Sequence, residues 1–95
     1  MCDLLSLLAR CEEDTARLLD QGAANRLANW RRYTDNQDKL VVFVQRVLRG
    51  DSRHNGWELD KIGGLSLERI VIEHCPEFFT QDDICEAKQT LGITD

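Results

Sequence analysis

The chain contains a single proline, and no part of it is rich in glycine, serine or proline, so nothing marks a linker or a low-complexity tract. No apolar run approaches the ~18–20 residues that a bilayer-spanning helix needs, so we expect no membrane partner. The apolar residues 4–9 lack a basic segment before them and are soon followed by the acidic residues 12–14, which argues against a signal peptide. Ninety-five residues suit a single domain spanning 1–95.

The chain also lacks two cysteines at close spacing in the sequence. Cys2, Cys11, Cys75 and Cys85 include no Cys-x-x-Cys pair, and four are few for a disulfide scaffold. We therefore expect free thiols and a cytoplasmic protein. His74, Cys75 and Cys85 would approach one another if the last two helices formed a hairpin, but they lack the short paired spacing of zinc ligands. We expect no metal ion and no other cofactor.

The chain does have clear helical periodicity. Between residues 3 and 20, apolar or small side chains recur at spacings of three and four, which is typical of one face of a helix. Gly22 is a plausible end, so residues 3–33 are either one long kinked helix or two shorter ones, with a break near Gly22 favoured. The face comprises Leu4, Leu8, Cys11, Thr15 and Leu18, with Leu5 and Leu19 beside it.

A second helix is predicted over residues 40–49. Its apolar positions follow the i, i+3, i+4, i+7, i+8 series of a core-facing helix, at Leu40, Phe43, Val44, Val47 and Leu48. Thr34 with Gln37, or Asp35 with Asp38, is expected to cap its start, and Gly50 to end it.

The remaining half of the chain contains an irregular segment and two more helices. Residues 50–65 show no helical period, and a short strand or turn is possible at 57–59. Ser66 is expected to cap a helix that ends before Pro76 and buries His74. Thr80 and Asp83 resemble a capping box for a helix that Gly92 ends. The predicted fold is therefore all-α: a small compact bundle of four or five helices with an irregular loop at about 50–65.

The net charge of −5 is unevenly distributed along the chain, since residues 1–25 carry −3, residues 26–61 carry +3 and residues 62–95 carry −5. Acidic residues 82, 83 and 86 exclude the last helix as a reader of a DNA groove. The Gly63–Gly64 pair has no following Lys-Ser or Lys-Thr, so it is not a phosphate loop. No small-molecule substrate is indicated.

The leading hypothesis is a non-enzymatic protein–protein interaction module, such as a small acidic adaptor, regulator or inhibitor. The N-terminal stripe has the 3.5-residue period of helix-pairing seams, which predicts self-association as a homodimer or docking on another protein. Packing of this helix inside a monomeric bundle is the alternative. The predicted protein-binding residues are Leu4, Leu5, Leu8, Cys11, Thr15 and Leu18.

Two further hypotheses come from other functional classes. Nucleic acid, or an acidic partner, would bind a basic strip made by the arginines of residues 26–53, although the acidic balance of the chain disfavours nucleic acid. A small enzyme would use the polar loop 51–61, where His54 and Trp57 are candidate binding residues, but no motif places a nucleophile beside a base, so we expect no enzyme. The arginines are Arg26, Arg31, Arg32, Arg46, Arg49 and Arg53.

Overall fold

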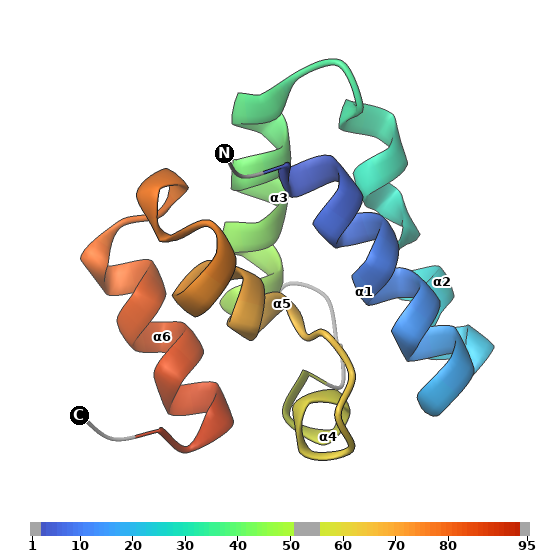
Figure 1. Ribbon diagram of the computed structural model, residues 1–95. Helices are drawn as coiled ribbons and strands as arrows, with labels where there is room; N and C mark the ends of the chain where they lie inside the picture. Colours follow the sequence, from blue (N-terminus) through green and yellow to red (C-terminus); the bar gives the residue numbers. More distant parts are fainter. Residues whose placement is uncertain (1–2, 51–55, 94–95) are drawn as a thin grey trace.

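The computed structural model describes residues 3–50 and 56–93, apart from the side chain of Arg26. All regular elements in this described part are helical, which confirms the all-α prediction (Figure 1). The α-helices are α1 (Leu4–Leu18), α2 (Gln21–Leu27), α3 (Gln37–Leu48), α4 (Gly56–Lys61), α5 (Leu67–Arg69) and α6 (Gln81–Leu91). Three shorter helical segments are η1 (Ala28–Tyr33), η2 (Ile70–His74) and η3 (Pro76–Phe78).

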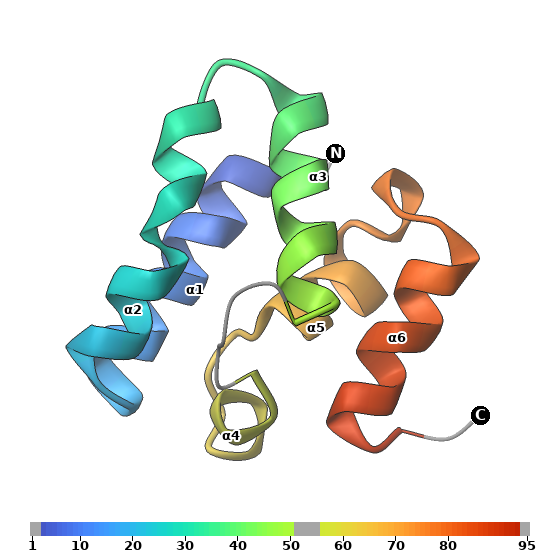
Figure 2. The ribbon, with the colours of Figure 1, turned by 180° about the vertical axis from the view of Figure 1, so that it is seen from behind.

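Helix α3 occupies the middle of the bundle. It contacts η1 and α1 on one side and α5 and α6 on the other, as both ribbon views show (Figures 1 and 2). The radius of gyration is 12.0 Å, close to the roughly 12–13 Å of a compact domain of this length. One hydrophobic cluster runs through all these elements, with Val44, Val47 and Ile70 at its buried centre.

The first helix ends earlier than the sequence suggested. Helix α1 stops at Leu18, and the Asp20 carboxylate accepts a hydrogen bond from the Ala23 amide at 2.7 Å, so Asp20 caps a new helix. Gly22 therefore lies inside α2 and does not end α1. The predicted break is confirmed, but its position is set by a capping aspartate because that side chain satisfies an amide left free by the new helix.

Helix α3 starts with a different cap from either predicted pair. The Asn36 side chain accepts a hydrogen bond from the Lys39 amide at 3.2 Å, and Gly50 follows the helix with φ of 87°. The predicted core face is confirmed, since its five members are between 0% and 8% exposed: Leu40, Phe43, Val44, Val47 and Leu48.

The segment expected to be irregular contains a helix. Residues 56–61 form α4, where a short strand or turn was considered possible, and residues 51–55 lie outside the described part. Leu59 of α4 is 2% exposed, so the single turn is stabilised by burial and not by its own length. Asp14 of α1 reaches the following loop, where its carboxylate accepts the Leu65 amide hydrogen bond at 2.9 Å.

The C-terminal third follows its predicted caps. Ser66 accepts a hydrogen bond from the Arg69 amide at 3.2 Å, and the helix widens into the π-turn η2 before Pro76. The Cys75 amide donates to the Ile70 carbonyl, an arrangement common at helix C-termini. Thr80 and Asp83 form both bonds of the capping box, which confirms that prediction. The added α4 and the separate α2 raise the number of α-helices above the four or five expected.

Within residues 3–50 and 56–93, no helix is both long enough and apolar enough to cross a bilayer.

Candidate functional site

The N-terminal stripe belongs to the protein's own core. Leu4, Leu8, Cys11 and Thr15 are at most 2% exposed, and Thr15 turns its hydroxyl inward to donate to the Cys11 carbonyl at 2.7 Å. Leu5 and Leu18 are half-buried at its edges. The chain therefore covers this stripe itself, because α2, α3 and α4 pack against α1. Leu4, Leu8, Cys11 and Thr15 are therefore not exposed as a docking surface, contrary to the expectation from the sequence, and self-association through α1 stays a prediction.

The thiols show the same effect of burial. Burial, with the nearby Glu68 carboxylate adding to it, raises the pKa of the Cys11 thiol to about 12, so this cysteine stays protonated. Cys85 on α6 is exposed and free. Cys75 is disulfide-bonded, so the expectation that all four cysteines are free thiols is wrong at this residue.

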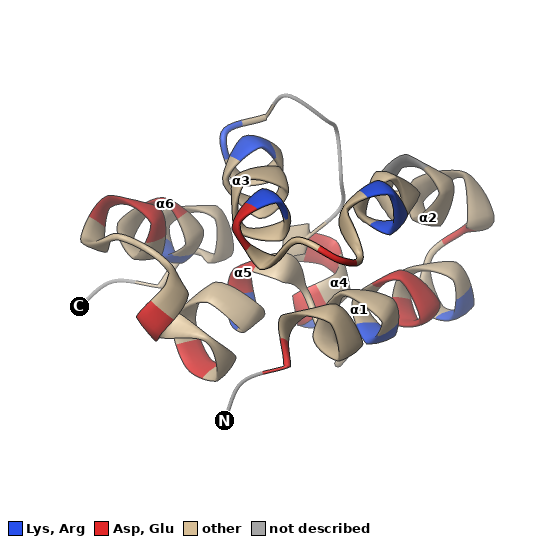
Figure 3. Ribbon diagram, turned by 90° about the horizontal axis from the view of Figure 1, so that it is seen from above, with Lys and Arg blue, Asp and Glu red and all other residues tan. Residues whose placement is uncertain are grey.

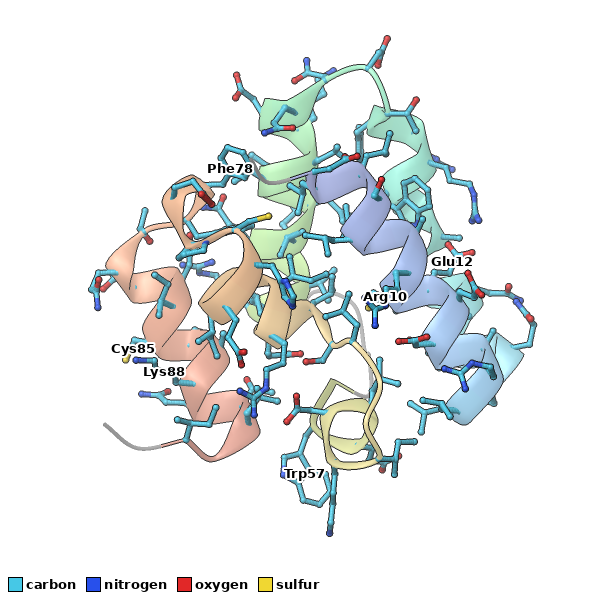
Figure 4. All side chains as sticks on the ribbon, viewed as in Figure 1. Arg10, Glu12, Trp57, Phe78, Cys85 and Lys88 are labelled. Atoms are coloured by element: carbon cyan, nitrogen blue, oxygen red, sulfur yellow. The ribbon has the colours of Figure 1, made fainter. Side chains whose placement is uncertain are left out.

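Two of the four predicted arginines whose side chains are described are held in ion pairs, Arg31 with Glu12 and Arg49 with Asp83. Arg31 donates to both carboxylate oxygens of Glu12 at 2.7 and 2.6 Å, and its guanidinium lies 4.8 Å from the centre of the Trp30 ring. Glu12 faces this pair from α1 (Figure 4), and it also accepts the Trp30 indole hydrogen bond at 2.8 Å. Arg31 thus ties η1 to α1. Arg32 is exposed, and the Arg26 side chain and Arg53 lie outside the described part.

Of the polar loop 51–61, the structure describes residues 56–61. His54 lies outside the described residues, and Trp57 points away from α4, 50% exposed, with the Lys61 ammonium 4.9 Å from its ring centre (Figure 4). Asp60 is held by Arg69 at 2.7 Å. The described residues contain no group of three or more histidine, cysteine, aspartate or glutamate side chains placed to hold a metal ion. His74 is exposed, which corrects the prediction that it is buried.

We take the outer face of α3 as the candidate functional site. Lys39, Val42, Arg46 and Arg49 follow one another at spacings of three, four and three, so they form a single line along the helix, which we call the α3 stripe. All four are exposed, and Val42 at 44% is among the most exposed large apolar side chains of the described residues. In Figure 2 α3 lies in front, between η1 and α6. A valine on the polar face of an otherwise regular amphipathic helix was the signal that the sequence reading missed.

A hollow lies on each side of the α3 stripe, and Val42 and Arg46 line both. The first, which we call the η1–α3 hollow, has a volume of about 250 Å³ and is also lined by Tyr33, Lys39 and Phe43. The second, the α3–α6 hollow, has a volume of about 330 Å³ and is lined, besides the shared pair, by Gln45, Arg49, Thr80 and Asp83. Two aromatic residues line the first hollow, whereas most residues that line the second are polar or charged.

Asp83 fixes the charge of the second hollow. Its carboxylate, almost fully buried, accepts hydrogen bonds from Gln45 and Arg49, both at 2.7 Å, and from the Thr80 amide at 3.0 Å. Burial alone would raise the pKa of Asp83, but these hydrogen bonds outweigh burial and lower it. The carboxylate thus compensates much of the Arg49 charge, and it holds α6 against α3.

Asp83 and its hydrogen-bond partners make the free energy of unfolding depend on pH in the acidic range. Because the folded pKa is lower than the unfolded value of about 3.9, the carboxylate stabilises the fold fully above that value, and this contribution is lost as the pH falls towards and through the folded pKa. We expect Asp83→Asn to lower the free energy of unfolding at pH 7 by about 1–3 kcal/mol. It should also flatten the acid limb of a stability–pH curve measured by urea unfolding.

Asp82→Asn is the matched control, since Asp82 lies in the same turn of α6 but is exposed. It should shift stability by a few tenths of a kcal/mol only. Equal acid limbs for the two variants would contradict the role assigned to Asp83.

No protein-family model, no curated protein and no solved structure matches this chain at a significant level, so its function is argued from its own residues.

Proposed function

We propose that this protein is a non-enzymatic protein-interaction module, acting as a small adaptor, regulator or inhibitor, which binds its partner through the outer face of α3. The observation that carries the proposal is Val42, an apolar side chain 44% exposed, flanked by cations along α3 and shared by two hollows. An apolar centre within a polar, charged rim is the usual anatomy of a protein interface.

The α3 face suits a partner better than the N-terminal stripe does. A dimer built on the stripe would have to extract side chains such as Leu4 and Leu8 from the core, and each costs about 1.5–3 kcal/mol to expose. Val42 and the hollows beside it require no such rearrangement. The proposed partner is therefore a different protein, bound by the folded monomer.

Nucleic acid fits this face less well. Arg31 is paired with Glu12 and Arg49 with Asp83, which leaves three exposed cations of η1 and α3 without an ion pair among the described residues: Arg32, Lys39 and Arg46. Figure 3 shows basic positions on η1 and α3 and acidic positions on α6. A chain of net charge −5 with so few available cations would neutralise few phosphates, and phosphate contacts supply most of non-specific affinity.

We place the module in the cytoplasm because Cys11 and Cys85 are free, whereas secreted proteins usually pair their thiols. The disulfide at Cys75 favours an oxidising compartment, so the presence or absence of this bond in living cells tests the cytoplasmic assignment. A reducing cytoplasm would open the disulfide that the structure shows at Cys75, so alkylating intact cells before lysis should trap this residue in the reduced form. Recovery of Cys75 as a disulfide after that treatment would overturn the cytoplasmic assignment.

Site-specific photo-crosslinking tests the interaction itself. A photo-reactive phenylalanine analogue is placed at position 42, and in a control at position 10, where Arg10 is exposed on α1, on the face opposite to the outer side of α3 (Figures 2 and 4). In a nuclease-treated lysate of cells that make the protein, we expect a discrete polypeptide adduct from position 42 only. Adding Arg46→Glu should remove this adduct, whereas Arg10→Glu should leave it unchanged.

Two results would contradict the proposal. One is an adduct from position 42 that forms only when the nuclease treatment of the lysate is omitted, since such an adduct contains nucleic acid. The other is an equal yield of polypeptide adducts from positions 42 and 10, since this would show that Val42 marks no specific interface.

A further inference from the structure

We propose that the η1–α3 hollow receives an acidic amphipathic helix of the partner protein. One of its apolar side chains enters the hollow beside Val42, and two carboxylates pair with Lys39 and Arg46. This inference rests on the proposed function and adds the chemical class of the partner to it.

The size and the aromatic lining of the hollow indicate what enters it. At about 250 Å³ it is smaller than the ~300–1,000 Å³ of pockets that enclose small molecules, so it suits a side chain better than a free ligand. Tyr33 and Phe43 line it, with ring centres 6.4 Å apart and planes inclined by 46°. Such a lining favours a leucine or an aromatic side chain, because apolar and edge-to-face aromatic contacts are both available.

The charges around this hollow determine which sign of charge its partner carries. Lys39 and Arg46 both line it, and neither has an ion pair within the described part of the chain, in contrast to Arg31 and Arg49. Two uncompensated cations at the rim of an apolar hollow attract carboxylates and repel basic segments. The α3–α6 hollow lacks this preference, because the Asp83 carboxylate already lies within it.

The spacing of the two cations fixes the form of the partner. Lys39 and Arg46 are seven residues apart, two helical turns, which places them about 10 Å apart along α3. An adjacent helix matches them with acidic residues at i and i+7. Its residues at i+3 and i+4 then lie over Val42 and the hollow, since these positions share the same face. The partner helix therefore carries two acidic residues seven positions apart, with an apolar residue at each of the third and fourth positions after the first acid.

A second copy of this chain does not supply that motif from its most acidic exposed helix. On α6, Asp82 and Glu86 are four residues apart, about 6 Å along the axis, and between them lies a buried carboxylate, Asp83. The acids are one turn apart instead of two. The inferred occupant is therefore a different polypeptide.

The experiment uses four synthetic helix-forming peptides and the full chain. The first carries glutamates at i and i+7 with leucine and phenylalanine at i+3 and i+4. The second replaces both glutamates by glutamine, the third replaces them by lysine, and the fourth moves them one turn apart. Binding is measured by fluorescence anisotropy, and circular dichroism verifies that every protein variant stays folded.

We expect the first peptide to bind most tightly, and Lys39→Glu and Arg46→Glu each to weaken it about tenfold. Arg10→Glu is the matched control and should change its affinity less than twofold. The sharpest result is a charge swap: the Lys39→Glu, Arg46→Glu double variant should prefer the lysine peptide over the glutamate peptide. Val42→Asp should weaken binding of the glutamine peptide as well.

Each contrary outcome identifies which proposal fails. If the glutamine peptide binds as well as the glutamate peptide, and the charge variants have no effect, the acidic preference is wrong while the α3 interface stands. If the peptide with closer glutamates binds best, the inferred spacing is wrong. If no peptide binds but position 42 still crosslinks a polypeptide, the helical motif is wrong alone. If no peptide binds and duplex DNA or single-stranded RNA binds through Arg46, both proposals fail.

Discussion

Replacing Leu8 by alanine is expected to lower the free energy of unfolding by about 2–5 kcal/mol, a large share of the roughly 5–15 kcal/mol of a typical domain. Leu8 is 2% exposed and belongs to the central hydrophobic cluster, so the truncation leaves a cavity that neighbouring helices cannot fill without moving. Urea unfolding followed by circular dichroism at the helical band measures the loss.

Leu5→Ala provides the matched control, since Leu5 occupies the same helix but is half-buried at the edge of the core. It should cost clearly less than Leu8→Ala.

The same experiment tests self-association through α1. If α1 packs only within its own chain, the unfolding midpoint of the wild-type protein stays the same over a hundredfold range of concentration. A midpoint that rises with concentration, and a rise that Leu8→Ala abolishes, would restore the predicted dimer.

Replacing Gly56 by alanine is expected to destabilise the protein by about 1–3 kcal/mol, near the upper end of that range. A Cβ at this position would lie 2.7 Å from Cδ of Glu68 and overlap its Oε1 atom. Glu68 is fully buried, so its carboxylate cannot simply turn out into solvent. The clash therefore forces either α4 or α5 to shift, and thermal unfolding should report it as a lower midpoint.

Gly22→Ala is the control for the general effect of adding a methyl group to a helical glycine. Gly22 is exposed within α2, and the nearest atom to its added Cβ is an oxygen of the Asp20 side chain, at 3.1 Å. The gain of about 1 kcal/mol in helix propensity should offset the slight crowding. If both alanine variants unfold at the wild-type midpoint, Gly56 is not held by a close approach to Glu68.

The sequence predicted helices best where a cap and an apolar face agree. Thr80 with Asp83 gave the start of α6, and the apolar series from Leu40 to Leu48 gave the buried side of α3. These signals are local, since a capping side chain and the residues of one helical face lie within two or three turns. The short helix α4 was missed because six residues are too few for a periodic pattern to emerge.

The candidate site was predicted only in part. Arg46 and Arg49 were selected as basic residues, but the sequence grouped them with Arg31, which the structure assigns to an ion pair with Glu12 nineteen residues away. Which cations remain available depends on partners that are distant in sequence. Val42 was overlooked because a single apolar residue on a polar face is common on protein surfaces and only its position between two hollows distinguishes it.

The sequence by itself determined that this protein is an all-α bundle, because capping and amphipathic period are encoded within each helix. It determined that the stripe from Leu4 to Leu18 is apolar, but not whether the stripe faces another chain or its own. Only the tertiary structure decided that, because burial is a property of how α1 meets α2, α3 and α4. The same packing pairs Arg31 and Arg49 with acidic residues and leaves Arg46 beside an open hollow, where the partner is proposed to bind.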